Sequence, residues 1–193
     1  DTVDLENELK EAIDKWGYVK SDIPKEQKFN IIIPMAGRGQ RWIDAGYTFP
    51  KPLIEVKNKP MIELVLENIN LEGNYIFICL KEHIEKFSLD TVLKNLKPEC
   101  KIISIDEITD GAASTILKSK ELINKDEPII IANCDQWIDW SSSRFIDFIN
   151  KKNPDAVLVT YTSTHPRNSF VKINKENQVV EIAEKKLISN IAN

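Results

Sequence analysis

Apolar runs of strand length alternate with amphipathic stretches from residue 29 onward. A strand covered on both faces has a nearly continuous apolar sequence, and such runs predict strands at 30–35, 75–80, 101–105, 128–132 and 156–161. Apolar residues at helical spacing predict helices at 61–69 behind Pro60, at 111–122 behind Asp110 and at 141–149 with Ser141 as the cap. A hairpin is expected at 170–173 and 179–182, with its turn at 174–177. The alternation predicts a layered α/β fold with a mostly parallel sheet.

The first 28 residues have a different pattern. Their apolar residues fall roughly on one face of a helix, at Val3, Leu5, Leu9, Ala12, Ile13 and Trp16. Gly17 ends that helix, and a polar linker containing Pro24 follows at 21–28. Such a helix would either pack on the domain surface or connect it to an upstream domain, and the pattern fits both. We therefore predict a helix and linker at 1–28 and one domain at 29–193.

Composition and charge narrow the class of partner. Hydrophobic residues make up 42% of the 193 residues, which is enough for a sizeable core. The formal net charge of -4 supplies no basic stripe for holding nucleic acid by its phosphates. No apolar run approaches the ~20 residues that span a bilayer, and the polar residues 1–10 do not form a signal peptide. The sequence predicts a cytoplasmic protein whose partners are neither nucleic acid nor membrane.

The cysteines do not form a metal-binding pattern. Cys79, Cys100 and Cys134 are widely spaced, and each lies in or beside an apolar run. Because His83 and His165 are the only histidines, a zinc site built from cysteine and histidine is not expected. The cysteines are predicted to be reduced core thiols, as is usual in the cytoplasm.

The most informative segment follows the first predicted strand, where residues 31–56 read IIIPMAGRGQRWIDAGYTFPKPLIEV. In an open α/β sheet, ligands bind at the carboxyl ends of the strands. Gly37 and Gly39 allow backbone N–H groups to approach a phosphate there, and Arg41 adds a cationic fork. Lys51 stands between two prolines, which stiffen the backbone that carries it. The combination favours a phosphate-binding loop over a simple turn with a surface lysine.

Two familiar phosphate-binding loops do not match this segment. Trp42 stands where a dinucleotide-binding fingerprint needs its third glycine. A Walker loop needs Gly-Lys followed by serine or threonine, and the chain contains no such sequence. The segment therefore indicates a different class of nucleotide site.

Ala36-Gly37-x-Gly39-x-Arg41, followed by Pro50-Lys51-Pro52-Leu53, resembles the signature of the sugar-phosphate nucleotidyltransferases, the nucleotide-sugar pyrophosphorylases. The similarity runs from Asn30 to the end of the chain. The family usually has a further glycine in place of Arg38 and threonine or serine in place of Gln40. The resemblance implies a three-layer, Rossmann-like nucleotidyltransferase (GT-A-like) fold with a mostly parallel mixed sheet.

The resemblance also implies roles for particular residues. The backbone of Ala36, Gly37 and Gly39 would cradle the triphosphate together with Arg41, and Lys51 would lie on the α-phosphate. Asp135 follows the strand predicted at 128–132 and matches the metal-binding aspartate of the family. A carboxylate at that place can hold Mg²⁺ beside a triphosphate, although Asp135 taken alone would be interpreted as a turn or helix cap. The expected catalytic residues are Arg41, Lys51 and Asp135, and the expected cofactor is Mg²⁺ bound to Asp135.

Further matches concern the base and the acceptor. Gly111 matches a glycine that contacts the nucleotide base in the family, while a plain helix N-terminus explains it equally well from the sequence alone. Asp106 or Glu107 would accept a hydrogen bond from an amino group of the base. Glu184-Lys185 matches a pair that binds the hydroxyls and the phosphate of the acceptor. Without the resemblance, this pair would be interpreted as solvated surface charges.

These residues predict transfer of a nucleotidyl group from a nucleoside triphosphate to a sugar 1-phosphate or a similar small phosphorylated acceptor, with release of pyrophosphate. Such a step serves nucleotide-sugar or surface polysaccharide biosynthesis. The acceptor phosphate is already a nucleophile, so the lack of a histidine or cysteine constellation agrees with this chemistry. A homo-oligomer and a fusion to an upstream domain are both compatible with the sequence.

Two alternatives stay open at this point. One is a nucleotide-sugar-dependent glycosyltransferase, which normally carries Asp-x-Asp where this chain has Asp135-Gln136-Trp137. The other is a non-catalytic nucleotide-binding module on the same fold. In the family, a second metal-binding aspartate usually comes well after the acid–lysine pair, whereas this sequence ends at Asn193. We therefore expect the fold to be truncated at its C-terminal end.

Overall fold

The structure is a computed structural model that describes residues 28–193. The helix predicted near the N-terminus, and all but the last residue of its linker, lie outside the described residues. Contacts divide the chain into one unit that ends at Phe145 and a second unit at Ile146–Asn193.

The first unit is built on a four-stranded sheet in which every neighbouring pair is parallel. The strand order is β5-β4-β1-β6, formed by β1 (Phe29–Met35), β4 (Gly73–Leu80), β5 (Lys101–Ile105) and β6 (Ile129–Ile131). The central strand β1 is paired on both sides, and Ile32 lies beside Ile76 and Ile131. The predicted parallel sheet is confirmed at four of the predicted strand positions.

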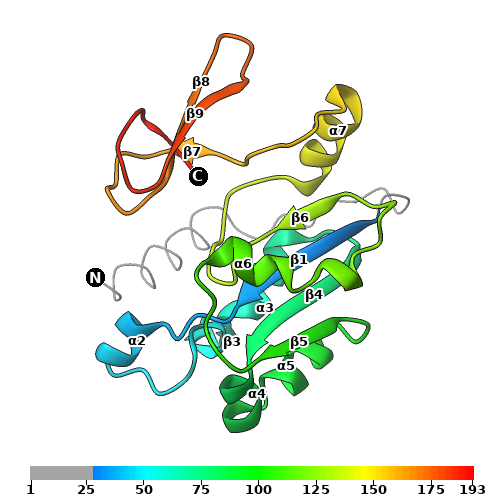
Figure 1. Ribbon diagram of the computed structural model, residues 1–193, viewed down its shortest axis with the longest axis vertical. Helices are drawn as coiled ribbons and strands as arrows, with labels where there is room; N and C mark the ends of the chain where they lie inside the picture. The colour runs from blue at the N-terminus through cyan, green and yellow to red at the C-terminus, as the bar shows by residue number, and fades with distance from the viewer. Residues whose placement is uncertain (1–27) are drawn as a thin grey trace. The chain divides into compact units, whose positions relative to one another are not determined.

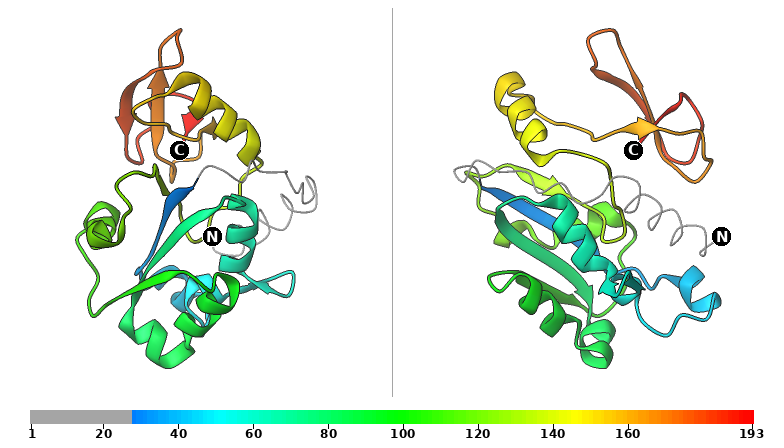
Figure 2. Two further views of the ribbon diagram at one scale, coloured as in Figure 1. Left: turned by 90° about the vertical axis from the view of Figure 1, so that its right-hand side faces the viewer. Right: turned by 180° about the vertical axis from the view of Figure 1, so that it is seen from behind.

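Helices cover both faces of this sheet, giving three layers. On one face, α6 (Ala112–Leu117) and the 3-10 turn η2 (Lys120–Leu122) follow β5, and Ile116 packs against Ile32 and Ile76. The left view of Figure 2 shows α3 (Met61–Ile69) on the opposite face from α6. Two short helices, α4 (Lys81–Phe87) and α5 (Leu89–Leu96), lie between β4 and β5 in the chain. The predicted helix at 61–69 is confirmed with the same bounds.

The strand order places a topological switch between β1 and β6. The chain runs outward from β1 through β4 to β5, and then crosses back by α6 so that β6 pairs with the other side of β1. In sheets of this kind, ligands bind outside the carboxyl ends of the two strands at the switch. In Figure 1, β1 and β4 point toward the side on which α2 (Gln40–Asp44) lies. The segments that follow β1 and β6 therefore meet at the edge where a ligand is expected.

A buried asparagine fixes the start of β1 beside the segment that leads into β6. The side chain of Asn30 is fully buried and uses all its hydrogen-bonding capacity. Its amide nitrogen donates to the carbonyl oxygens of Asn124 at 2.8 Å and Glu127 at 3.0 Å. Its oxygen accepts from the Asn74 amide at 3.0 Å and the Asn124 backbone N–H at 2.8 Å. Burial without these partners would be costly, so this network stabilises the attachment of the start of β1 to the segment before β6.

The structure corrects two predicted elements. The helix predicted at 111–122 ends at Leu117 and resumes only as η2, because the Ser119 hydroxyl donates to the Ile116 carbonyl at 2.6 Å and competes with the helical pattern. Asp110 is not its cap, since Gly111 is the residue before the first turn. The strand predicted at 156–161 forms only at β7 (Tyr161–Thr162). An apolar run becomes a strand where a partner pairs with it, and here β10 (Ile191–Ala192) pairs only with these two residues.

The second unit contains an antiparallel sheet with the order β7-β10-β8-β9. Its hairpin, β8 (Phe170–Ile173) and β9 (Val179–Ala183), confirms the predicted one. In the turn, the Asn174 N–H donates to the Gln178 carbonyl at 2.9 Å. The helix predicted at 141–149 is α7 (Ser142–Lys152), and the Ser141 hydroxyl caps it by accepting from the Arg144 N–H at 3.3 Å. Among the described residues, no helix has the length and apolar character that crossing a membrane requires.

Candidate active site

The glycine loop follows β1 directly, and its two glycines differ in what they provide. Gly39 has φ +64°, a conformation that glycine adopts without strain. Its carbonyl accepts the Trp42 N–H at 2.8 Å and so begins α2. Gly37 has no left-handed φ, and a Cβ added there would meet none of the described atoms within 4 Å. Gly39 is thus required by the backbone, whereas Gly37 keeps space open in front of the loop.

Lys51 is held by a rigid local structure, as its two neighbouring prolines predict. It opens the 3-10 turn η1 (Lys51–Leu53), which Pro50 precedes with φ -61°. The Leu53 N–H donates to the Pro50 carbonyl at 2.8 Å, and Pro52 is buried. The short strands β2 (Glu55–Val56) and β3 (Lys59–Pro60) then form a small hairpin before α3. The lysine side chain is 22% exposed, so the turn presents it at a partly enclosed position.

Asp135 comes four residues after the end of β6, and its carboxylate contacts Lys51. The Lys51 Nζ pairs with the Asp135 Oδ2, although 84 residues separate the two in sequence. The Asp135 side chain is 25% exposed, which leaves the pair accessible from solvent. The structure therefore brings together the predicted cation and the predicted metal ligand at the switch between β1 and β6.

Tryptophans pack beneath this ion pair. Trp42 is 5% exposed and belongs to a core cluster with Ile54, Val56, Met61 and Leu64. The Lys51 Nζ lies 5.6 Å from the centroid of the Trp42 ring, within the range of a cation–π interaction. Trp137 packs against the same cluster. Trp42 and Trp137 both serve in packing. The contact of Trp42 with Lys51 has no sequence signal beyond the place of Trp42 after the glycine loop.

Trp140 lies outside this cluster. Its indole N–H donates to the Asn68 carbonyl at 2.8 Å, and its ring packs 5.3 Å from that of Phe145, measured between centroids. These contacts give Trp140 a role in packing.

Cys134 precedes Asp135 and is a free thiol. Burial, together with the neighbouring Asp135 carboxylate, raises the pKa of Cys134 to about 12. A thiol that stays protonated near neutral pH is a poor nucleophile. Cys134 is therefore a packing residue, as predicted, and the chemistry of the site rests on its charged groups.

The predicted residues around the base lie on the segment from β5 to α6. Gly111 precedes α6, and its carbonyl accepts from the hydroxyls of Thr109 at 3.0 Å and Thr115 at 3.2 Å. A Cβ added to Gly111 would meet no atom of the described residues within 4 Å. The Asp106 carboxylate is 81% exposed and lies 3.5 Å from the Lys81 Nζ. Roles for Gly111 and Asp106 in binding a base stay predictions.

Arg41, Glu184 and Lys185 also keep predicted roles. Arg41 lies in the first turn of α2. Glu184 and Lys185 belong to the second unit, where their charged groups are 3.0 Å apart and the Ser169 hydroxyl donates to Glu184 at 2.8 Å. The hydrogen bonds from Lys185 and Ser169 lower the pKa of the exposed Glu184 carboxyl. Glu184 is therefore an anion that can accept hydrogen bonds near neutral pH.

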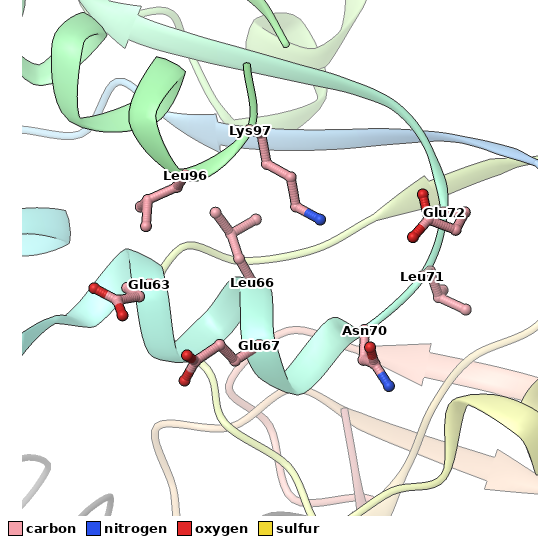
Figure 3. A pocket seen from close by; sticks show the side chains of 8 residues that line it. All are labelled: Glu63, Leu66, Glu67, Asn70, Leu71, Glu72, Leu96 and Lys97. Atoms are coloured by element: carbon pink, nitrogen blue, oxygen red, sulfur yellow. The ribbon is translucent and has the colours of Figure 1, made fainter. Parts of the chain in front are cut away.

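A pocket of about 280 Å³ lies away from these residues, beside α3 and the end of α5 (Figure 3). Leu71 and Glu72, just before β4, and Lys97, before β5, line it together with Glu63 and Glu67 of α3. These positions mark the amino ends of the strands. The pocket is therefore at the opposite edge of the sheet from Lys51 and Asp135 and is not the predicted nucleotide site.

The described residues contain no group of three or more histidine, cysteine, aspartate or glutamate side chains arranged to hold a metal ion. Mg²⁺ does not require such a cage, because it is commonly bound by one or two carboxylates together with substrate phosphates and water. Asp135 offers one accessible carboxylate beside the glycine loop. The residues present therefore fit a magnesium ion that arrives with a triphosphate.

The fold is an α/β domain that carries a glycine loop and an acid–lysine pair at the switch of a parallel sheet. Residues 30–189 match the model of the family described as Nucleotidyl transferase, and the chain belongs to this family. It is 26% identical over 148 residues to a mannose-1-phosphate guanyltransferase of Yarrowia lipolytica, covering 75% of this chain and 41% of that protein. It is 27% identical over 154 residues to the bifunctional protein GlmU of Methanocaldococcus jannaschii, covering 80% and 35%. The chain thus spans less than half the length of these relatives.

Solved structures support the fold. The nucleoside-diphosphate-sugar pyrophosphorylase of Vibrio cholerae RC9 matches with a TM-score of 0.66 and 22% identity, covering 84% of this chain and 69% of that one. At this level of identity the likeness establishes the fold, a three-layer α/β nucleotidyltransferase architecture.

Proposed function

We propose that this protein transfers a nucleotidyl group from a nucleoside triphosphate to a sugar 1-phosphate or a similar small phosphorylated acceptor, releasing pyrophosphate. The observation that carries the proposal is the contact between Lys51 and Asp135 beside Gly39, at the switch between β1 and β6. A metal-bound triphosphate needs a cation beside its phosphates and a carboxylate ligand for its metal ion, and Lys51 and Asp135 would supply these two groups. Membership of the nucleotidyl transferase family and the similarity to a mannose-1-phosphate guanyltransferase support the same reaction.

The reaction is an in-line attack of an acceptor phosphate oxygen on the α-phosphorus. The new oxygen–phosphorus bond forms as the bond to the β-phosphate oxygen breaks, and pyrophosphate leaves with that electron pair. The nucleophile is already an anion, so no side chain has to remove a proton. Catalysis then depends on positioning and on stabilising charge at the phosphates.

Lys51 would stabilise the charge that develops at the α-phosphate. The open space at Gly37 lets backbone N–H groups approach the phosphates, and Arg41 would add a second positive charge. Asp135 would hold Mg²⁺, whose chemistry is to neutralise phosphate charge and fix phosphate geometry. In the free protein, Lys51 and Asp135 neutralise each other, so binding exchanges their ion pair for contacts with phosphate and metal.

The remaining predicted residues have roles at the ends of the substrates. Gly111 and Asp106 would contact the base, and Glu184 and Lys185 would bind the hydroxyls and the phosphate of the acceptor. We place the protein in the cytoplasm, in nucleotide-sugar biosynthesis, because nucleoside triphosphates are available there and because Cys79, Cys100 and Cys134 are free thiols.

A screen for pyrophosphate release tests the proposal. The common nucleoside triphosphates would be combined with a panel of sugar 1-phosphates, phosphocholine and polyol phosphates, with and without Mg²⁺. We expect one triphosphate–acceptor pair to release pyrophosphate only when both substrates and Mg²⁺ are present, with the coupled product seen by mass spectrometry. Binding of a nucleotide-sugar without pyrophosphate release by any pair would instead favour a non-catalytic module.

A further inference from the structure

Lys51 has two partners among the described residues, and they differ in kind. One is the Asp135 carboxylate, which pairs with its Nζ. The other is the indole of Trp42, whose ring centroid is 5.6 Å from the Nζ. The carboxylate is a ligand for metal ions and would be engaged by one in the proposed reaction. The indole face is not a ligand for Mg²⁺. It can therefore contact Lys51 both with and without a metal ion on Asp135.

Trp42 is itself held firmly. It is 5% exposed within the cluster of Ile54, Val56, Met61 and Leu64. The Trp42 and Tyr47 rings pack edge to face, with their centroids 4.9 Å apart and their planes at 74°. The backbone N–H of Trp42 donates to the Gly39 carbonyl at 2.8 Å. A ring fixed by packing and by the backbone gives the lysine a defined surface rather than a mobile one.

The glycine loop, the tryptophan and the lysine also lie close to one another at Gly39. A Cβ added to Gly39 would lie 3.8 Å from the Lys51 Cβ and 3.8 Å from the Trp42 Cδ1. The indole therefore lies beside both the last glycine of the loop and the base of the lysine side chain. Displacing the ring would change the distance between the phosphate-binding backbone and the ammonium group.

From this geometry, and resting on the proposed function, we propose that Trp42 is a positioning residue for Lys51. It keeps the ammonium group at the carboxyl edge of the sheet when the Asp135 carboxylate is engaged by a metal ion. Without the indole, Lys51 would lose its remaining contact at the moment when it has to stabilise the α-phosphate.

Nuclear magnetic resonance of the full chain with labelled lysine tests the contact without any substrate. Lys51→Arg assigns the signals of the Lys51 ε-methylene group, which the indole ring current should shift upfield. We expect the shift to persist in Asp135→Asn, to decrease in Trp42→Phe and to disappear in Trp42→Leu. Loss of the shift in Asp135→Asn, or its persistence in Trp42→Leu, would overturn the proposal.

Kinetics then separate positioning from general stability. With the substrate pair found by the screen, Trp42→Leu should lower kcat roughly tenfold, the size of a partly buried cation–π contact, with little change in KM for the triphosphate. Trp42→Phe should recover most of the loss. In a Lys51→Ala background, Trp42→Leu should add almost nothing, because the group that it positions is absent. Equal losses in both backgrounds would mean that Trp42 acts only through folding.

Trp140→Leu is the matched control, because Trp140 packs on Phe145 and Asn68 without contacting Lys51. It should lower thermal stability while leaving kcat within about twofold, as expected for a packing change away from the site. If the wild-type chain released no pyrophosphate with any pair, the proposed function would fail, and the resonance of Lys51 would still decide whether Trp42 holds it.

Discussion

Gly37 and Gly39 belong to one motif but serve it in different ways. Gly39 adopts φ +64° and packs beside Lys51 and Trp42, so its lack of a side chain is a backbone requirement. Gly37 has no left-handed φ, and among the described atoms none lies within 4 Å of a Cβ added there. The described part of the chain gives no structural reason for a glycine at this position, which is what a close approach by a ligand would produce.

Gly37→Ala should therefore keep the thermal stability of the wild type but weaken phosphate binding. Loss of a charge-assisted backbone contact predicts about tenfold weaker binding of inorganic tripolyphosphate with Mg²⁺, measured by calorimetry. Gly39→Ala is the contrast, because its left-handed backbone should lower stability by about 1 kcal/mol. Unchanged tripolyphosphate affinity in Gly37→Ala would show that no phosphate approaches that position.

His83 is expected to make the folding stability of the protein depend on pH. It is buried in α4, and its Nδ1 has no hydrogen-bond partner among the residues that the structure describes. Its ring lies edge-on to Phe87, 6.4 Å between centroids. Burial lowers the pKa of His83 below its ordinary value, while Glu82 opposes the shift and Lys86 adds to it. The folded state therefore favours the neutral imidazole.

A histidine whose pKa is lower in the folded state binds its proton more readily when the chain unfolds. Stability is unaffected well above the unfolded pKa of about 6.5 and decreases as the pH falls through that value. We predict that the melting temperature falls between pH 7.5 and pH 5.5 and that His83→Leu makes this fall shallower. Parallel pH curves for the two proteins would contradict the assignment to His83.

At the scale of elements, the central feature is the attachment of β6 to β1. The strand β6 is short, and its residues Ile129 and Ile131 are more than half exposed. Apolar burial alone therefore holds β6 only weakly. The Asn30 network links the start of β1 to the loop that precedes β6 and to Asn74 of β4. Correct placement of β6 in turn places Asp135.

Asn30→Ala should lower the free energy of unfolding by at least ~2 kcal/mol, because it leaves several buried polar groups without partners. Chemical denaturation of the full chain measures this directly. Asn150→Ala, at an exposed position of α7, should change stability by less than ~0.5 kcal/mol. Equal effects of the two changes would mean that the Asn30 network contributes nothing specific.

The elements that could be predicted are those with a long, uniform signal. Buried strands such as β1 and β4 have continuous apolar sequences, and α3 has a proline before it and a clear period. The helices α4 and α5 gave no such signal, because Ser88 adopts φ +51° between them and each is short. The run at 156–161 has the composition of a strand, but strand formation depends on a partner that sequence does not reveal.

In the candidate site, Lys51 was singled out by its two prolines after the glycine loop, and Asp135 by its place after a predicted strand and by the family resemblance; their roles stay predictions. Their contact could not be predicted, since 84 residues separate them and only the strand order brings them together. The contact of Trp42 with Lys51 was missed because a buried aromatic residue looks the same in sequence whether it fills a core or supports a charge.

At the scale of the whole molecule, the chain belongs to the nucleotidyl transferase family and spans 41% and 35% of two curated relatives. The expectation of a truncated C-terminal end stays a prediction, as do the roles of Arg41, Glu184 and Lys185. The first unit carries the acid–lysine pair and the glycine loop, which are the groups proposed to act on the triphosphate. Loss of activity on changing these groups is therefore the most direct test of the account.

The decisive measurement is the single-turnover rate of pyrophosphate release by the full chain, with the substrate pair from the screen. Lys51→Ala and Asp135→Ala should each slow it at least ~100-fold, the size of a lost electrostatic contact in a transition state. Lys94→Ala, which removes a lysine that is 60% exposed on α5, should leave the rate unchanged. Near-wild-type rates in both Lys51→Ala and Asp135→Ala would contradict the account.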